Sequence, residues 1–99
     1  MNKRKQKLIL TPRDRIRCFL EAYYPDEVDK ILLADGLDNA FKGVINRDGK
    51  PVAVYGKRTC LFELAKTNNW SIDDAEEYFS FNVEGAYVGD RTPLFMEEL

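Results

Sequence analysis

Apolar residues recur at three- and four-residue intervals in two stretches of the N-terminal third, a spacing that places them on one side of a helix. Thr11 is a capping residue and Pro12 suits the first helical position, so the pattern predicts a helix over residues 12–23. Pro25 ends that helix and permits a second one over residues 26–36. The buried side of this second helix would be formed by Val28, Ile31 and Leu32.

The period then changes to the alternation that is typical of strands. Residues 39–46 and 52–55 read as two strands, and the turn-rich run Asn46-Arg47-Asp48-Gly49 separates them. Pro51 has no amide proton for a ladder, so we expect it at the start of its strand or on an edge. These features predict an antiparallel hairpin.

Helical spacing returns in the second half of the chain. One helix is expected over residues 57–66, and a second begins at Ser71, whose side chain can accept a hydrogen bond from the Asp74 amide. Trp70 precedes this cap and can pack on the new helix. Past Gly85 and its loop, residues 93–96 could add a third strand at an edge of the sheet.

These elements together predict an α+β fold with about four helices, in the order α-α-β-β-α-α-β. The sheet would be small and antiparallel, consisting of the hairpin and a C-terminal edge strand. We expect residues 1–10 to form a basic, mobile arm and residues 11–99 to form one globular domain, because 99 residues supply one modest core.

The net charge of −2 conceals a strong asymmetry. Residues 1–17 carry a net charge of +6, whereas residues 18–99 carry −8. The basic end is explained either by a solvated terminus or by contacts with nucleic-acid phosphates. The candidate phosphate contacts are Lys3, Arg4, Lys5, Lys7, Arg13 and Arg17.

The composition argues against several classes of site. Histidine is absent, and Cys18 and Cys60 do not have the spacing of zinc ligands, so we expect no metal and no cofactor. Two reduced core cysteines in a cytoplasmic protein are the simplest reading, with a disulfide between them as the alternative. No apolar run is long enough to span a bilayer, so no membrane association is expected.

Few residues suggest chemistry. Cys60 lies near Lys57 and Arg58, which could lower its thiol pKa, although a packed core cysteine is the simpler interpretation. An acidic helix face could bind a partner through Asp73, Asp74, Glu76, Glu77 and Glu84. A loop site for a ligand or an interaction could be formed by Asn82, Tyr87, Asp90 and Arg91.

The run EEYFSFNVEGAYVGDRTP, residues 76–93, carries a family resemblance. It resembles the C-terminal EYFxFNVxGAYVGxxTP motif of a family of small uncharacterised proteins encoded by bacteria and their phages. The likeness extends over residues 40–95, including Cys60, but Gly56 to Thr59 depart from the family pattern just before that cysteine. The resemblance implies no particular activity.

Three hypotheses about function follow. The first is a non-enzymatic phage or prophage accessory protein that binds a host protein, inhibition of a defence system being one such role. The second is nucleic-acid binding through the basic arm and the first helix. The third is a small-ligand or catalytic site at the loop after the last helix. The sequence gives no indication of an oligomeric state.

Overall fold

The computed structural model describes residues 10–99, and its first element is α1 (Pro12–Tyr23). Thr11 and Asp14 form a reciprocal capping box, in which Thr11 Oγ1 accepts from the Asp14 amide at 3.0 Å and Asp14 Oδ2 accepts from the Thr11 amide at 3.1 Å. The predicted limits of this helix are confirmed. Its buried side chains, Ile16 and Leu20, face the sheet and the segment that follows.

The predicted second helix is wrong. Residues 24–37 form a chain of turns with isolated backbone hydrogen bonds, such as Lys30 N to Glu27 O at 2.8 Å, and only a short 3₁₀ turn, η2 (Asp38–Ala40), precedes the sheet. Ile31 and Leu37 are buried, but they reach the core from a segment that bends. Among the described residues the order is therefore α-β-β-α-α-β with three α-helices, not about four.

The predicted hairpin is confirmed as β1 (Phe41–Arg47) and β2 (Lys50–Gly56), which pair antiparallel. Asp48 and Gly49 make the two-residue turn, with φ of 52° and 83°, the left-handed backbone that such a turn requires. Pro51 lies in the central strand, but the third strand pairs only with residues 54–56. The missing amide proton of Pro51 therefore removes no hydrogen bond between β2 and β3.

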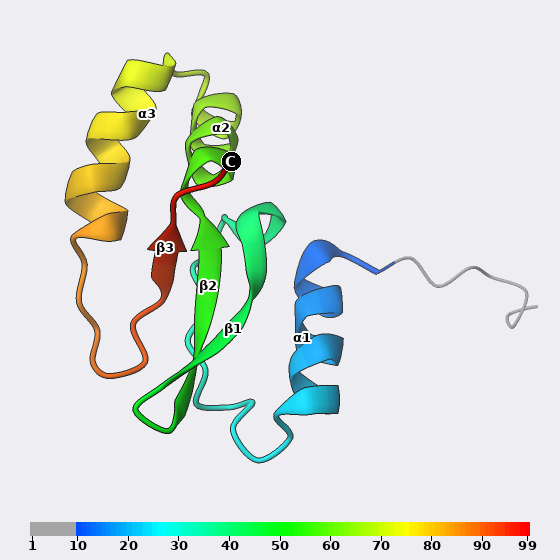
Figure 1. Ribbon diagram of the computed structural model, residues 1–99. Coiled ribbons are helices and arrows are strands. Elements are labelled where there is room, and N and C mark those ends of the chain that lie inside the picture. Colours follow the sequence, from blue (N-terminus) through cyan, green and yellow to red (C-terminus); the bar gives the residue numbers. More distant parts are fainter. Residues whose placement is uncertain (1–9) are drawn as a thin grey trace, which may run out of the picture.

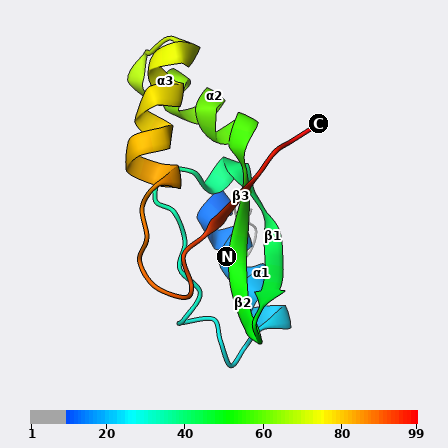
Figure 2. The ribbon, with the colours of Figure 1, turned by 60° about the vertical axis from the view of Figure 1, so that its left-hand side comes forward.

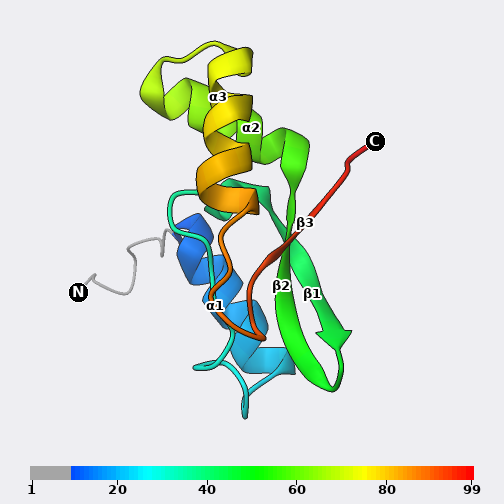
Figure 3. The ribbon, with the colours of Figure 1, turned by 90° about the vertical axis from the view of Figure 1, so that its left-hand side faces the viewer.

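Two helices follow β2 directly: α2 (Lys57–Asn68) and α3 (Ile72–Phe79). Ser71 Oγ accepts from the Asp74 amide at 3.1 Å, which confirms the predicted cap, and Asn69 ends α2 in a left-handed conformation. A π-helical turn, η3 (Ser80–Glu84), extends α3. Figures 1 and 3 show this pair of helices standing beyond one end of the sheet.

The third strand, β3 (Leu94–Met96), occupies an edge as predicted, but it runs parallel to β2 rather than antiparallel. The reason lies in the connection. Residues 85–93 run back along the sheet after α3, so β3 starts from the same end as β2 (Figure 1). The sheet order is β1-β2-β3, and the expectation of a purely antiparallel sheet is wrong.

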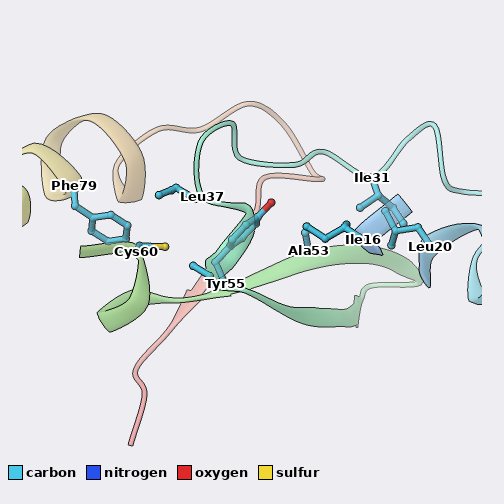
Figure 4. Packing of buried hydrophobic residues seen from close by; sticks show 9 residues of the cluster. Ile16, Leu20, Ile31, Leu37, Ala53, Tyr55, Cys60 and Phe79 are labelled. Atoms are coloured by element: carbon cyan, nitrogen blue, oxygen red, sulfur yellow. The ribbon is translucent and has the colours of Figure 1, made fainter. Parts of the chain in front are cut away.

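The core is elongated and centres on Tyr55, which is fully buried. Figure 4 shows Tyr55 between two groups of side chains, one formed by Leu37, Cys60 and Phe79 and the other by Ala53 with residues of α1 and Ile31. Figure 2 shows the same arrangement of elements from another side, with α1 and the helix pair at different levels along the sheet. The described part of the chain contains no helix long and apolar enough to cross a membrane.

Candidate functional site

Within residues 10–99, three segments enclose an apolar cleft. One wall is the segment 32–37, the second is the end of α3 with η3, and the third is residues 86–95. The volume is about 480 Å³. The cleft is lined by Leu32, Leu33, Ala34, Asp35, Leu37, Tyr78, Asn82, Val83, Ala86, Val88, Thr92, Pro93 and Phe95.

The floor of this cleft is part of the core. Phe95 of β3 packs edge-on against Phe79 of α3, with ring centroids 5.1 Å apart, and lies 5.7 Å from the Tyr55 ring. Leu37 is almost completely buried below it. The floor is therefore formed by side chains that also pack in the core.

The walls are fixed by hydrogen bonds. The Ala34 amide donates to the Tyr55 hydroxyl at 2.8 Å, which holds the segment 32–37 over β2. In the opposite loop, Thr92 Oγ1 accepts from the Val88 amide at 2.9 Å and donates to Gly89 O at 2.6 Å. The loop that carries Val88 is thus closed on itself and presents this side chain at the rim.

Aromatic and aliphatic side chains extend the cleft onto the surface. Val88 is 61% exposed, and its neighbour Tyr87 is also exposed. On α3, Tyr78 lines the cleft and its ring lies 5.2 Å from the ring of Trp70, which is 36% exposed. Trp70 therefore does not enter the core. It forms, with Tyr78, a pair of exposed aromatic side chains beside the cleft.

Acidic groups border the cleft. Asp35 belongs to its lining, with a side chain that is 98% exposed. Asp74 lies one helical turn before Tyr78, on the same side of α3. A cleft with an apolar interior and acidic borders fits an apolar side chain that has basic neighbours.

The predicted acidic face is more dispersed than expected. Asp73, Asp74, Glu76, Glu77 and Glu84 are all exposed. However, Glu76 lines a different, smaller cleft next to α2, whereas Tyr78 and Asn82 line the large one. Glu84 lies 3.7 Å from Lys57 Nζ. These five carboxylates surround the exposed half of α3 and its extension rather than forming one flat surface.

The predicted loop site does not assemble either. Asn82 lines the cleft and donates to Tyr78 O at 3.3 Å, and Tyr87 lies exposed beside it. Asp90 accepts from Lys50 Nζ at 2.8 Å, and this hydrogen bond lowers the pKa of its carboxyl. Arg91 donates to Glu27 at 2.7 Å, which lowers the pKa of Glu27. Asp90 and Arg91 are thus both paired within the fold, with Lys50 and Glu27 respectively.

The predicted basic contacts are only partly described. Lys3, Arg4, Lys5 and Lys7 lie outside the described residues. Arg13 donates from Nε and Nη2 to Asp38, at distances of 2.9 to 3.1 Å, so its guanidinium is engaged within the fold. Arg17 is exposed. Of the two predicted contacts that the structure describes, only Arg17 is free of such an internal pairing.

Cys60 is fully buried, and burial raises the pKa of its thiol to about 12. It is therefore not a reactive thiolate at neutral pH. Both cysteines are free, which excludes the disulfide alternative for this structure. Within residues 10–99 no group of three or more Cys, Asp or Glu side chains is arranged to hold a metal ion.

Sequence reasoning missed one wall of the cleft. The run Ile31-Leu32-Leu33-Ala34 falls in the predicted second helix, whose buried side was expected to be Val28, Ile31 and Leu32, but Leu32, Leu33 and Ala34 all line the cleft. Four consecutive apolar residues exceed what one face of a short helix can bury, and this was the available signal.

No protein-family model, no curated protein and no solved structure matches the chain. The site is therefore interpreted from its own geometry.

Proposed function

We propose that this chain is a non-enzymatic binding protein that receives a segment of a partner protein in the cleft between residues 32–37, α3–η3 and residues 86–95. The observation that carries the proposal is the combination of an apolar cleft with an exposed aliphatic and aromatic rim. Such rims are costly to expose unless a partner covers them. Tyrosine and tryptophan also supply much of the binding energy of protein interfaces.

The chemistry of the partner segment follows from the lining. An apolar or aromatic side chain would fill the volume of about 480 Å³ over Phe95 and Leu37. Lysine or arginine residues next to that side chain would face Asp35 and Asp74. The affinity would therefore fall with rising salt, but only modestly, since both carboxylates lie at the exposed border.

The biological setting is proposed from the family resemblance of residues 76–93. Phage and prophage accessory proteins of this size often act on host proteins, so a host protein is the partner class that we propose. A component of a defence system is one such partner. The buried, protonated Cys60 and the lack of a described metal cluster favour binding over catalysis.

The test compares two matched substitutions in a capture experiment with host lysate. Val88→Asp places a carboxylate in the cleft, and Ile45→Asp places one on the exposed side of edge strand β1. We expect a protein captured by the wild type to be retained by Ile45→Asp and lost with Val88→Asp. Capture that is equal for both variants would place binding elsewhere and overturn the proposal.

The border charges provide a second, quantitative test on the identified partner. Asp35→Lys and Asp74→Lys should each weaken binding, because they would repel the basic residues of the partner. Asp29→Lys is the control, since Asp29 is exposed, does not line the cleft and, unlike Asp74, is not placed one helical turn before Tyr78. Equal affinity for all three variants, measured by calorimetry, would argue against a basic partner segment.

Nucleic-acid binding remains the second candidate, and the exposed position of Arg17 on α1 favours it. Together with Lys3, Arg4, Lys5 and Lys7 it would give binding that weakens steeply with salt. Fluorescence anisotropy with a labelled duplex should then show this salt dependence for the full chain and lose it when residues 1–9 are deleted. Undetectable binding at low salt would remove this candidate.

A further inference from the structure

A second apolar surface lies on the other side of α3, where this helix meets α2. Phe62 of α2 is 55% exposed and Ile72 of α3 is 43% exposed. Both border a cleft of about 280 Å³ that Leu61 also lines. The helix pair stands beyond the end of the sheet (Figures 1 and 3), and among the described residues only Glu97 and Glu98 line this cleft besides α2 and α3.

Opposite charges flank this surface on the two helices. Arg58 lines the cleft from α2, and Glu76 lines it from α3. The wider composition is divided in a similar way. On α2, the basic residues Lys57, Arg58 and Lys66 accompany one acidic residue, Glu63, whereas Asp73, Asp74 and Glu77 accompany Glu76 on α3. One surface thus carries an apolar centre and both signs of charge.

We propose that this surface, defined by Arg58, Leu61, Phe62, Ile72 and Glu76, binds a second copy of the same chain. A two-fold symmetric interface uses one patch twice, so the patch must be complementary to itself. Placing α2 of one protomer against α3 of the other satisfies this condition, because Arg58 then approaches Glu76 of the partner. Phe62 of one protomer packs beside Ile72 of its partner. The two-fold axis repeats this contact with the two protomers exchanged.

The charge distribution also selects among symmetric arrangements. Packing α2 against α2 would direct Arg58 toward the end of the partner helix that carries Lys66, which is repulsive. Packing α3 against α3 would bring acidic residues together. Only the arrangement of α2 on α3 places opposite charges across the interface on both sides of the axis.

The expected dimer is weak. A helix of 12 residues, such as α2, is about 18 Å long, so the surface is near the lower limit of specific interfaces. Association should therefore depend on concentration, with a dissociation constant in the micromolar range. The surface does not overlap the large cleft, since Tyr78 and Asn82 lie on the opposite side of α3 from Ile72 and Glu76.

The test is sedimentation velocity of the full chain over a range of protein concentrations. The wild type should shift from monomer to dimer, and Phe62→Asp should remain a monomer. Arg58→Glu and Glu76→Arg should each weaken dimerisation at least about tenfold, because each creates a like-charge contact. The double variant R58E/E76R exchanges the two charges and should restore association.

The control variant is Glu77→Arg, which makes the same charge change on α3 at an exposed residue outside both clefts. It should dimerise as the wild type does. A wild type that stays monomeric throughout the range would overturn the proposal. Failure of the double variant to regain association, with circular dichroism showing a folded protein, would overturn the assigned pairing of α2 with α3.

Discussion

Glu98 provides the cap that the N-terminus of α2 does not obtain from its own segment. The preceding residue, Gly56, has no side chain to bond the first amides of the helix. Instead, the Glu98 carboxylate accepts from the Thr59 amide at 2.7 Å and from Thr59 Oγ1 at 2.9 Å. Lys42 Nζ of β1 lies 3.0 Å from the same carboxylate. A C-terminal residue thus joins a helix start to the edge strand of the hairpin.

This arrangement predicts a specific acid sensitivity. The hydrogen bond from the Thr59 amide is the main cause that lowers the pKa of Glu98 from 4.5 to about 2, and Lys42 adds to it. A lowered folded-state pKa stabilises the fold above pH 4.5, and this stabilisation is lost as the pH falls toward 2. In urea unfolding, Glu98→Gln should therefore show a shallower loss of stability over this range than the wild type.

The control for this experiment is Glu97→Gln, because the neighbouring Glu97 side chain is 87% exposed and contacts only Lys57, at 3.7 Å. Its pH profile should match that of the wild type. If the Glu98→Gln profile also matches, the carboxylate does not cap α2 in solution.

Gly56 leaves room for the same contact. A Cβ atom at this position would collide with the Glu98 carboxylate, although the backbone φ of −85° suits any residue. Gly56→Ala should therefore destabilise the fold by about 1 kcal/mol, because the flexible Glu98 side chain must move and weaken its hydrogen bonds to Thr59. In a Glu98→Ala background, Gly56→Ala should lower the free energy of unfolding much less, because the Glu98 carboxylate is no longer present. Equal costs in both backgrounds, by chemical denaturation, would contradict the contact.

At the scale of elements, the segment 24–37 illustrates how tertiary contacts override local pattern. Its acidic start and apolar spacing predicted a helix, but three side chains from elsewhere hold it as turns: Arg91 on Glu27, Tyr55 on Ala34, and Arg13 on Asp35. A helix of this length is marginal in isolation, so a few such contacts decide its conformation. None of these pairings is visible in the local sequence.

Tyr55→Phe tests this interpretation. Burial raises the pKa of the Tyr55 phenol to about 12, so the hydroxyl stays neutral and available to the Ala34 amide. Its removal leaves that amide without its acceptor and should cost about 1 kcal/mol in the free energy of unfolding. Hydrogen exchange at Ala34 should accelerate more than at residues of α1. Unchanged exchange at Ala34 would show that other contacts hold the segment.

The elements that the sequence predicted correctly are those with local signals. Thr11 with Pro12 defined the start of α1, Asp48 with Gly49 the hairpin turn, and Ser71 the start of α3. The direction of β3 was not predictable in this way, because it depends on residues 85–93 running back along the sheet. Local chemistry fixes where an element begins, whereas the path of a connection depends on the whole fold.

At the scale of the whole molecule, the same reason explains why the large cleft was missed. Leu33, Asn82 and Val88 belong to three segments that meet only in the folded chain. Sequence reasoning placed Asn82 in a possible loop site, and Asn82 does line the cleft. It could not identify the opposite wall, because that wall was assigned to a helix that does not form.

The rate at which a thiol reagent labels Cys60 reports whether the folded core stays closed. This residue of α2 lies next to Phe79 and has no exposed surface (Figure 4), and burial raises its thiol pKa to about 12, whereas Cys18 on α1 is exposed. Iodoacetamide should therefore label Cys18 readily and Cys60 at least about a thousandfold more slowly, because Cys60 becomes accessible only when the core opens. Mass spectrometry of a Cys18→Ser variant isolates the slow reaction, which urea should accelerate in parallel with global unfolding. Rapid labelling of Cys60 in native buffer would mean that α2 and α3 separate from the sheet without unfolding of the rest, and would make the helix pair an independent unit.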